Sequence, residues 1–259
     1  MKLFDSHSHL NDEKFDDDRE EVIENICKSG VTNFITAGYS VESSKKALEI
    51  SKNYDFIYTT AGISPNDIPQ NEDELWKELK EIEDLVNKNS KKIVAIGEIG
   101  LDYYWNTENK ELQKKAFIEQ IKIANKCDLP IVIHTREAVM DTLQILKDNN
   151  VLKKGVFHCC PQNRELIKEA LKLGFYISFA GPITFKNSKN AEEMINLVPN
   201  DKLLIETDSP YLSPEPYRGK RNTPANVRFV AQKVADAKGL TIDEVANITY
   251  NNTIKIFSI

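Results

Sequence analysis

Short apolar runs and longer amphipathic segments alternate along this chain. The runs are rich in Ile, Val, Leu and Phe, as is typical of strands that are buried on both faces. The first is the apolar pair at residues 3–4, which leads into a polar end at 5–9. The other seven predicted strands are residues 33–38, 56–62, 93–98, 130–134, 155–158, 175–179 and 203–208.

Between these runs, apolar residues recur every three or four positions, which predicts helices with one apolar face. Val22, Ile23 and Ile26 form one such face, and Gly30 ends that segment. Helices are predicted at residues 16–29, 41–52, 72–89, 108–126, 138–147, 164–172, 191–197, 224–237 and 242–256.

Eight strands that each precede a helix indicate a parallel sheet covered by helices. This number of units in a chain of 259 residues is that of an α/β protein with a (β/α)8 TIM barrel. An open doubly wound sheet is the alternative, but it normally carries a Gly-rich phosphate loop after its first strand. Without a linker or a shift in composition, we expect one domain over residues 1–259.

Composition narrows the class of protein further. No apolar run is long enough to span a bilayer, and the first dozen residues lack a secretory h-region, so we expect no membrane partner. The four scattered cysteines are expected to be reduced thiols in a cytoplasmic protein. They are Cys27, Cys127, Cys159 and Cys160. Because the net charge is −6, binding of a nucleic acid would need metal ions and a local basic patch.

Polar residues with metal-ligand chemistry end several of the predicted strands. His7 and His9 are two residues apart, so they point to the same face of a strand. In a (β/α)8 barrel, the carboxyl ends of all strands meet at the active-site face. All four histidines and two carboxylates are predicted at that face. They are His7 and His9 on the first strand, Glu98 on the fourth, His134 on the fifth, His158 on the sixth and Asp208 on the eighth.

This set offers six nitrogen and oxygen ligands without a cysteine. It could hold one cation or two cations in a shared cage. A bridging carboxylate such as Glu98 suits a pair of cations roughly 3.5–4 Å apart. The residue types leave zinc, manganese and magnesium open as the metal.

Several longer motifs contain these residues. They are Asp5-Ser6-His7-Ser8-His9-Leu10, Ala95-Ile96-Gly97-Glu98-Ile99-Gly100-Leu101-Asp102-Tyr103-Tyr104, Pro130-Ile131-Val132-Ile133-His134-Thr135-Arg136, Phe157-His158-Cys159 and Glu206-Thr207-Asp208-Ser209-Pro210-Tyr211-Leu212. Through them the chain resembles the TatD family of metal-dependent deoxyribonucleases over nearly its whole length. It departs from that pattern at Cys160, where Phe is more usual, and at Thr223, where Glu is more usual.

The resemblance implies a barrel with two divalent metal ions that hydrolyses phosphodiester bonds in DNA, as an exonuclease. It assigns His7, His9, Glu98 and Asp208 to one cation and Glu98, His134 and His158 to the other. Glu98 and Asp208 are then the expected catalytic residues, with Asp208 orienting or deprotonating a metal-activated water. Asp5 and Glu206 share the strand face of the ligands and are expected to support them or to lie in the barrel interior, whereas Asp102 could orient a supporting group or cap a turn.

The predicted loops after strands five, six and eight contain four arginines, which suit contacts with phosphate. The predicted substrate contacts are Arg136, Arg164, Arg218, Arg221 and Tyr103. Tyr103, Tyr104 and Trp105 form an aromatic cluster that could stack on a base or pack under the loop.

Other functions use the same residues. The same cage could cleave another phosphoester, an amide or a lactone, or deacylate an aminoacyl-tRNA. A binding protein that has lost its activity is a further alternative, but such a protein would normally lack some of the metal ligands, and this sequence contains all six. We expect DNA as the substrate and a monomer or weak oligomer.

Overall fold

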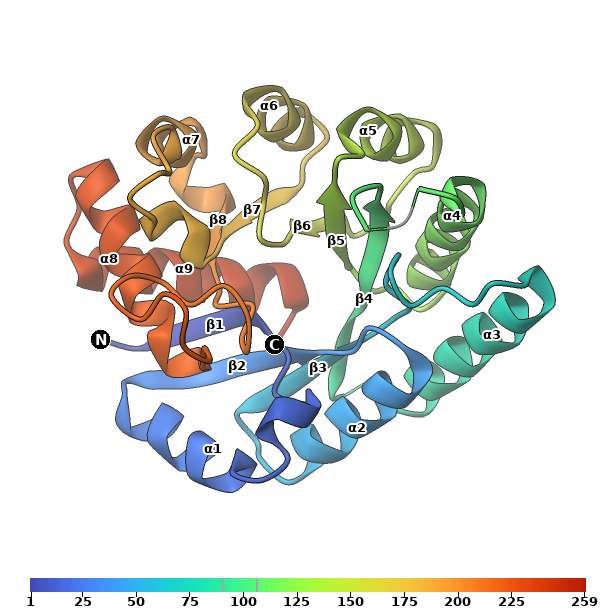
Figure 1. The fold of residues 1–259 in the computed structure, drawn as a ribbon, viewed down its shortest axis with the longest axis horizontal. Helices are drawn as coiled ribbons and strands as arrows, with labels where there is room; N and C mark the ends of the chain where they lie inside the picture. Colours follow the sequence, from blue (N-terminus) through green and yellow to red (C-terminus); the bar gives the residue numbers. More distant parts are fainter. Residues whose placement is uncertain (90, 106) are drawn as a thin grey trace.

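The computed structural model describes residues 1–89, 91–105 and 107–259. Eight parallel strands form one sheet in the order β1 to β8, each paired with the next (Figure 1). The strands are β1 Leu3–Ser8, β2 Val31–Ala37, β3 Ile57–Ala61, β4 Ile93–Asp102, β5 Ile131–Arg136, β6 Gly155–Phe157, β7 Tyr176–Phe179 and β8 Leu203–Ile205. This order confirms the predicted (β/α)8 barrel.

Helices alternate with the strands and surround them in Figure 1. They are α1 Arg19–Lys28, α2 Val41–Lys52, α3 Glu72–Lys88, α4 Lys110–Lys126, α5 Val139–Asp148, α6 Arg164–Lys172, α7 Ala191–Leu197, α8 Val227–Lys238 and α9 Ile242–Phe257. A short 3-10 helix, η2 Gly181–Thr184, follows β7. Within the described ranges, no helix combines the length and the apolarity needed to cross a bilayer.

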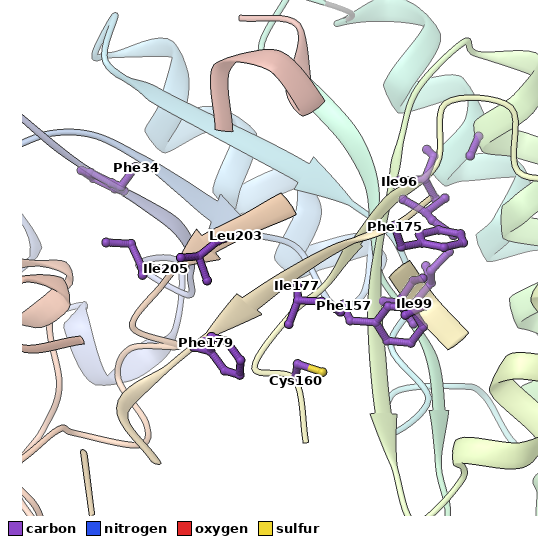
Figure 2. Packing of buried hydrophobic residues seen from close by; sticks show 14 of the residues in the cluster. Phe34, Ile96, Ile99, Phe157, Cys160, Phe175, Ile177, Phe179, Leu203 and Ile205 are labelled. Carbon is purple, nitrogen blue, oxygen red and sulfur yellow. The ribbon is translucent and has the colours of Figure 1, made fainter. Parts of the chain in front are cut away.

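The apolar core has two parts. The larger lies between the strands and the surrounding helices, and Figure 2 shows some of its members. The rings of Phe157 and Phe175 meet there edge to face, with centroids 5.7 Å apart. The smaller part joins strand residues such as Phe4 and Leu204 to Ile256 and Phe257 of α9. Because α9 packs on β1 and β8, it supports the barrel where the first and last strands meet.

The structure corrects several predicted strand ends, and two of the corrections concern the candidate carboxylates. β4 continues past Glu98 to Asp102, because Ile99 and Leu101 pair with β5 and are fully buried. Glu98 therefore lies inside its strand. β8 ends at Ile205, so Asp208 follows the strand in a turn. The first predicted helix was also too long, since α1 begins at Arg19.

Two strands change register where they carry candidate ligands. Ile96 pairs with Ile131, but Ile99 pairs with Ile133, so three steps along β4 match two along β5. β1 shows the same shift against β2 in the segment that contains His7. One extra residue, as in a β-bulge, bends a strand and redirects a side chain. The shifts thus occur where His7 and Glu98 turn toward the active-site end.

The two ends of the sheet are joined by buried polar contacts. The Asp5 carboxylate accepts hydrogen bonds from the backbone N–H of Thr207 at 2.8 Å and from its hydroxyl at 2.6 Å. The backbone N–H of Asp208 donates to the His7 carbonyl at 3.0 Å. These bonds place the residues that follow β8 against β1.

Gly100 tests how tightly β4 and β5 pack. It has a φ of +139°, and a Cβ added to it would lie 2.0 Å from the His134 carbonyl oxygen. We expect Gly100→Ala to lower the free energy of unfolding by about 3 kcal/mol, measured by urea denaturation. Gly239→Ala is the control, because Gly239 has a φ of +65° but no atom within 4 Å of the added Cβ. It should cost only about 1–2 kcal/mol, and equal losses in both variants would contradict the proposed clash.

Candidate metal centre

The Glu98 carboxylate lies between two pairs of imidazoles. Its Oε2 is 3.4 Å from Nε2 of His7 and 3.5 Å from Nε2 of His9. Its Oε1 is 2.9 Å from Nδ1 of His134 and 3.3 Å from Nε2 of His158. One carboxylate oxygen therefore faces each pair, which is the arrangement of a bridging ligand.

Asp208 completes the group on the His9 side. Its Oδ1 lies 3.3 Å from Nε2 of His9 and 3.7 Å from Nε2 of His7. Its backbone has a φ of 55°, in the left-handed region that Asp tolerates better than most residues. The turn after β8 thus directs this carboxylate back toward β1.

The spacing of these atoms fits cation binding. Ligands placed tetrahedrally at roughly 2.1 Å from an ion are about 3.4 Å from one another. The Nε2 atoms of His7 and His9 are 3.2 Å apart, as are Nδ1 of His134 and Nε2 of His158. Two overlapping groups have the ligand atoms of a metal site, His7–Glu98–His158 and His7–His9–Asp208. The donor set is nitrogen and oxygen only, which suits zinc, manganese or magnesium.

Both carboxylates of this centre are held in their ionised form. Burial raises the pKa of Glu98, but the charge of His158 and hydrogen bonds from His134 and His7 outweigh burial and hold it well below its ordinary range. Burial likewise opposes ionisation of Asp208, and its hydrogen bond with His9 lowers its pKa overall. The centre therefore keeps two negative charges that attract a cation.

The imidazoles respond to these charges in different directions. Burial lowers the pKa of His158, but the charge of Glu98 and a bond to Glu206 raise it well above its usual value. Burial and the nearby His158 lower the pKa of His7. Since metal ligation needs neutral imidazole, protons and metal ions compete for this centre.

The outer nitrogens of His9 and His158 each face an oxygen atom. Nδ1 of His9 is 3.1 Å from the Ala37 carbonyl oxygen. Nδ1 of His158 is 3.3 Å from Oε1 of Glu206, a carboxylate that also accepts the backbone N–H of Cys159 at 2.7 Å. Such contacts fix which ring nitrogen faces a metal. The Asp5 carboxylate instead bonds to Thr207 and joins β1 to the segment after β8.

Asp102 both contacts an imidazole and caps the turn that follows it, the two roles that the sequence left as alternatives. Its Oδ2 lies 3.0 Å from Nε2 of His134. Its Oδ1 accepts the backbone N–H groups of Tyr104 at 2.9 Å and Trp105 at 3.0 Å. Burial opposes ionisation, but the hydrogen bond with His134 and the backbone bond from Trp105 lower the pKa of Asp102 to about 2. One carboxylate thus orients an imidazole and caps the aromatic turn.

The predicted substrate contacts are scattered. The Arg136 guanidinium lies 3.8 Å from the centroid of the Tyr104 ring, beside the metal centre. Arg164 pairs with Glu193, and Arg221 pairs with Asp18. Arg218 stacks on the Phe185 ring, with its guanidinium 4.2 Å from the centroid. The Tyr103 hydroxyl donates to Asp141 at 2.7 Å, and Lys110 covers its ring. Arg136 alone of these five lines a cavity beside the metal centre.

A cavity of about 510 Å³ opens over the centre. Sequence reasoning missed two of its lining residues, Asn66 and Tyr211. Asn66 lies in the loop after β3, donates to Asp102 at 3.3 Å, and carries no signal in the local pattern. Tyr211 follows Asp208 by three residues, and its place in the loop after the eighth strand was the available signal.

Sequence comparisons agree on one family. The family described as "TatD related DNase" matches residues 4–258. A Bacillus subtilis protein named "Uncharacterized metal-dependent hydrolase YabD" is 44% identical over 261 residues, covering 99% of each chain. An Escherichia coli protein named "Uncharacterized metal-dependent hydrolase YcfH" is 37% identical over 264 residues, covering 100% of this chain and 97% of its own.

Solved structures show the same fold. The crystal structure of YJJV, a TatD homologue from Escherichia coli, superposes with a TM-score of 0.93 at 26% identity. The alignment covers 99% of this chain and 98% of that one.

We expect Asp102→Asn to lower the affinity for a divalent cation by about 10–100-fold, the usual effect of losing such a support. The Asn carbonyl oxygen can keep the N–H groups of Tyr104 and Trp105. Its amide group then faces Nε2 of His134 and forces the ring proton onto Nδ1, which points at Glu98. Competition with a chelating dye measures the affinity.

The matched control is Asp141→Asn, which removes a neighbouring carboxylate charge that pairs with Lys114 and Tyr103. It should bind metal as the unmodified protein does. An Asp102→Asn protein with unchanged affinity would show that Asp102 does not set the orientation of His134.

Proposed function

We propose that this chain, a metal-dependent hydrolase that belongs to the TatD-related DNase family, cleaves phosphodiester bonds of DNA from a strand end. The observation that carries the proposal is the Glu98 carboxylate between two imidazole pairs, with one oxygen toward each. A site of this kind suits two cations, and paired cations serve in-line displacement at phosphorus.

The ligand assignment follows from the two sides of Glu98. On one side, His7, His9 and Asp208 would hold the first cation together with Glu98. On the other side, His134 and His158 would hold the second cation with the remaining oxygen of Glu98. Bound divalent cations neutralise charge on a phosphoryl oxygen and make a water molecule acidic near neutral pH.

We assign to Asp208 the role of accepting the proton of the attacking water. It lines the cavity over the centre, and its depressed pKa keeps it ionised and able to accept a hydrogen bond. His9 lies 3.3 Å from the same carboxylate and limits its orientation. Asp208 would therefore orient the water and receive its proton, while Glu98 holds the centre together.

The surroundings of the centre favour an anionic substrate with aromatic groups. Arg136 supplies positive charge beside the cavity, on a chain whose net charge is −6. Trp105 is 69% exposed and Tyr211 is 43% exposed, and both line the cavity over the ligands. Exposed aromatic rings stack on bases without regard to sequence. Arg164 and Arg221 are paired with carboxylates, so we assign phosphate contact first to Arg136.

The first test is nucleotide release from end-labelled single-stranded DNA. Metal-stripped protein would receive Mg²⁺, Mn²⁺ or Zn²⁺ separately. We expect metal-dependent release from one end, and Glu98→Gln should reduce it at least about 100-fold, since even supporting residues cost about 10–100-fold. Glu83→Gln, at a carboxylate of α3 that is paired with Lys80 and Lys126, is the matched control.

Metal-loaded protein that releases no nucleotide from either end would contradict the nuclease proposal. The alternative is another phosphoester, an amide or a lactone cleaved by the same cage. A substrate panel with the same Glu98→Gln variant would then identify the bond that is cleaved.

Asp208→Asn separates proton transfer from metal binding. Asparagine tolerates the left-handed backbone at this position and keeps one ligand oxygen. We expect kcat to fall about 10²–10⁴-fold, the usual contribution of a general base. The metal content, measured by atomic emission, should stay unchanged. Near-normal turnover in this variant would exclude Asp208 as the proton acceptor.

A further inference from the structure

A second cavity, of about 630 Å³, lies next to the one over the metal centre. This size falls within the range of small-molecule sites, about 300–1,000 Å³. Both cavities are lined by His134, His158 and Asp208, and Trp105 and Tyr211 also border both. A molecule whose reacting group is at the candidate ligands can therefore extend into the second cavity.

One wall of the second cavity is apolar. It contains Cys160 from the segment after β6, Pro182 and Ile183 from η2, and Leu212 from the loop after β8. Cys160 is 5% exposed, and Figure 2 shows it among the buried apolar side chains. Burial raises the pKa of its thiol, so it stays neutral and acts as an apolar surface.

This wall is held in place by the backbone. The N–H of Cys160 donates to the Ser178 carbonyl on β7 at 2.9 Å. A Cβ added to Gly181 would lie 1.8 Å from the Leu212 carbonyl oxygen, so η2 and the loop after β8 are in close contact. The cavity is thus a built feature of three adjoining segments.

The rest of the lining includes a flat aromatic ring and several polar groups. Trp105 is 69% exposed and borders this cavity, and its backbone N–H donates to Oδ1 of Asp102 at 3.0 Å. Thr135 and Gln162 add polar atoms to the lining. Arg136 is the cation among the lining residues, and its guanidinium already stacks on Tyr104. One guanidinium against an apolar wall suits a planar group with a polar edge better than a second phosphate.

We propose that this cavity receives one nucleobase of the nucleotide whose phosphate lies at the metal centre. The proposal rests on the nuclease function above and specifies its substrate contact. A nucleobase has two apolar faces, which suit the apolar wall and the Trp105 ring, and a hydrogen-bonding edge, which suits Thr135 and Gln162. Stacking on an aromatic ring raises the affinity for a base about 5- to 150-fold.

The test compares the binding of deoxyadenosine monophosphate and deoxyribose phosphate to metal-loaded protein. The chain has two tryptophans, so a Trp76→Phe background leaves Trp105 as the fluorescent reporter. We expect the base to increase affinity about 5- to 150-fold and to quench Trp105. Equal affinities for the two ligands would overturn the proposal.

Filling the cavity should remove the contribution of the base to the affinity and leave the contribution of the sugar phosphate unchanged. Cys160→Phe adds a ring to the apolar wall, and Leu212→Phe does so at a position that is 39% exposed and thus easier to fill without unfolding, while both leave Trp105 as the fluorescent reporter. In either folded variant, the ratio of the two affinities should fall to within about twofold of one, with deoxyribose phosphate binding unchanged. Cys27→Phe, at an exposed cysteine of α1, is the control. A folded variant that keeps the original ratio would contradict the assignment.

Binding and hydrolysis separate the two proposals. A contribution from the base without release of nucleotides from DNA would retain the cavity assignment and reject the nuclease. Hydrolysis of DNA without a contribution from the base would retain the nuclease and reject the cavity assignment.

Discussion

The structure depends on one buried carboxylate placed among four imidazoles. Glu98 is 7% exposed, and burial alone would make its negative charge costly. The imidazoles on both sides offset that cost and hold its pKa well below the ordinary range. To bring these groups together, the barrel must align β1, β4 and β5 with the segment after β6. The register shifts in β1 and β4 provide that alignment where the side chains are needed.

Much of the fold and of the candidate site could be predicted from the sequence. Continuous apolar runs identify buried parallel strands, and the barrel rule then brings His7 and Asp208 to one face. The continuation of β4 beyond Glu98 was missed, because an acidic residue inside a strand resembles a strand end. The pairing of Arg164 with Glu193 could not be predicted either, since it depends on a contact between α6 and α7.

The residues around the centre link metal binding to substrate binding. Asp102 contacts His134 with one oxygen and the Tyr104–Trp105 turn with the other. A displacement of the Tyr104–Trp105 turn would therefore move the carboxylate that contacts His134, and a rotation of the His134 ring would act on the turn through the same carboxylate. Sequence reasoning left the two roles of Asp102 as alternatives, because each is a local pattern that the residue alone satisfies. The structure shows that the same side chain satisfies both.

The contacts between β1 and the segment after β8 set the order in which the barrel can close during synthesis. His7 and His9 are synthesised about two hundred positions before Asp208. Asp5 can bind Thr207 only at that stage. A cation that prefers the full ligand set then favours the closed barrel over the open chain by mass action. Metal binding would thus stabilise the closed barrel, in which His7 and His9 lie beside Asp208.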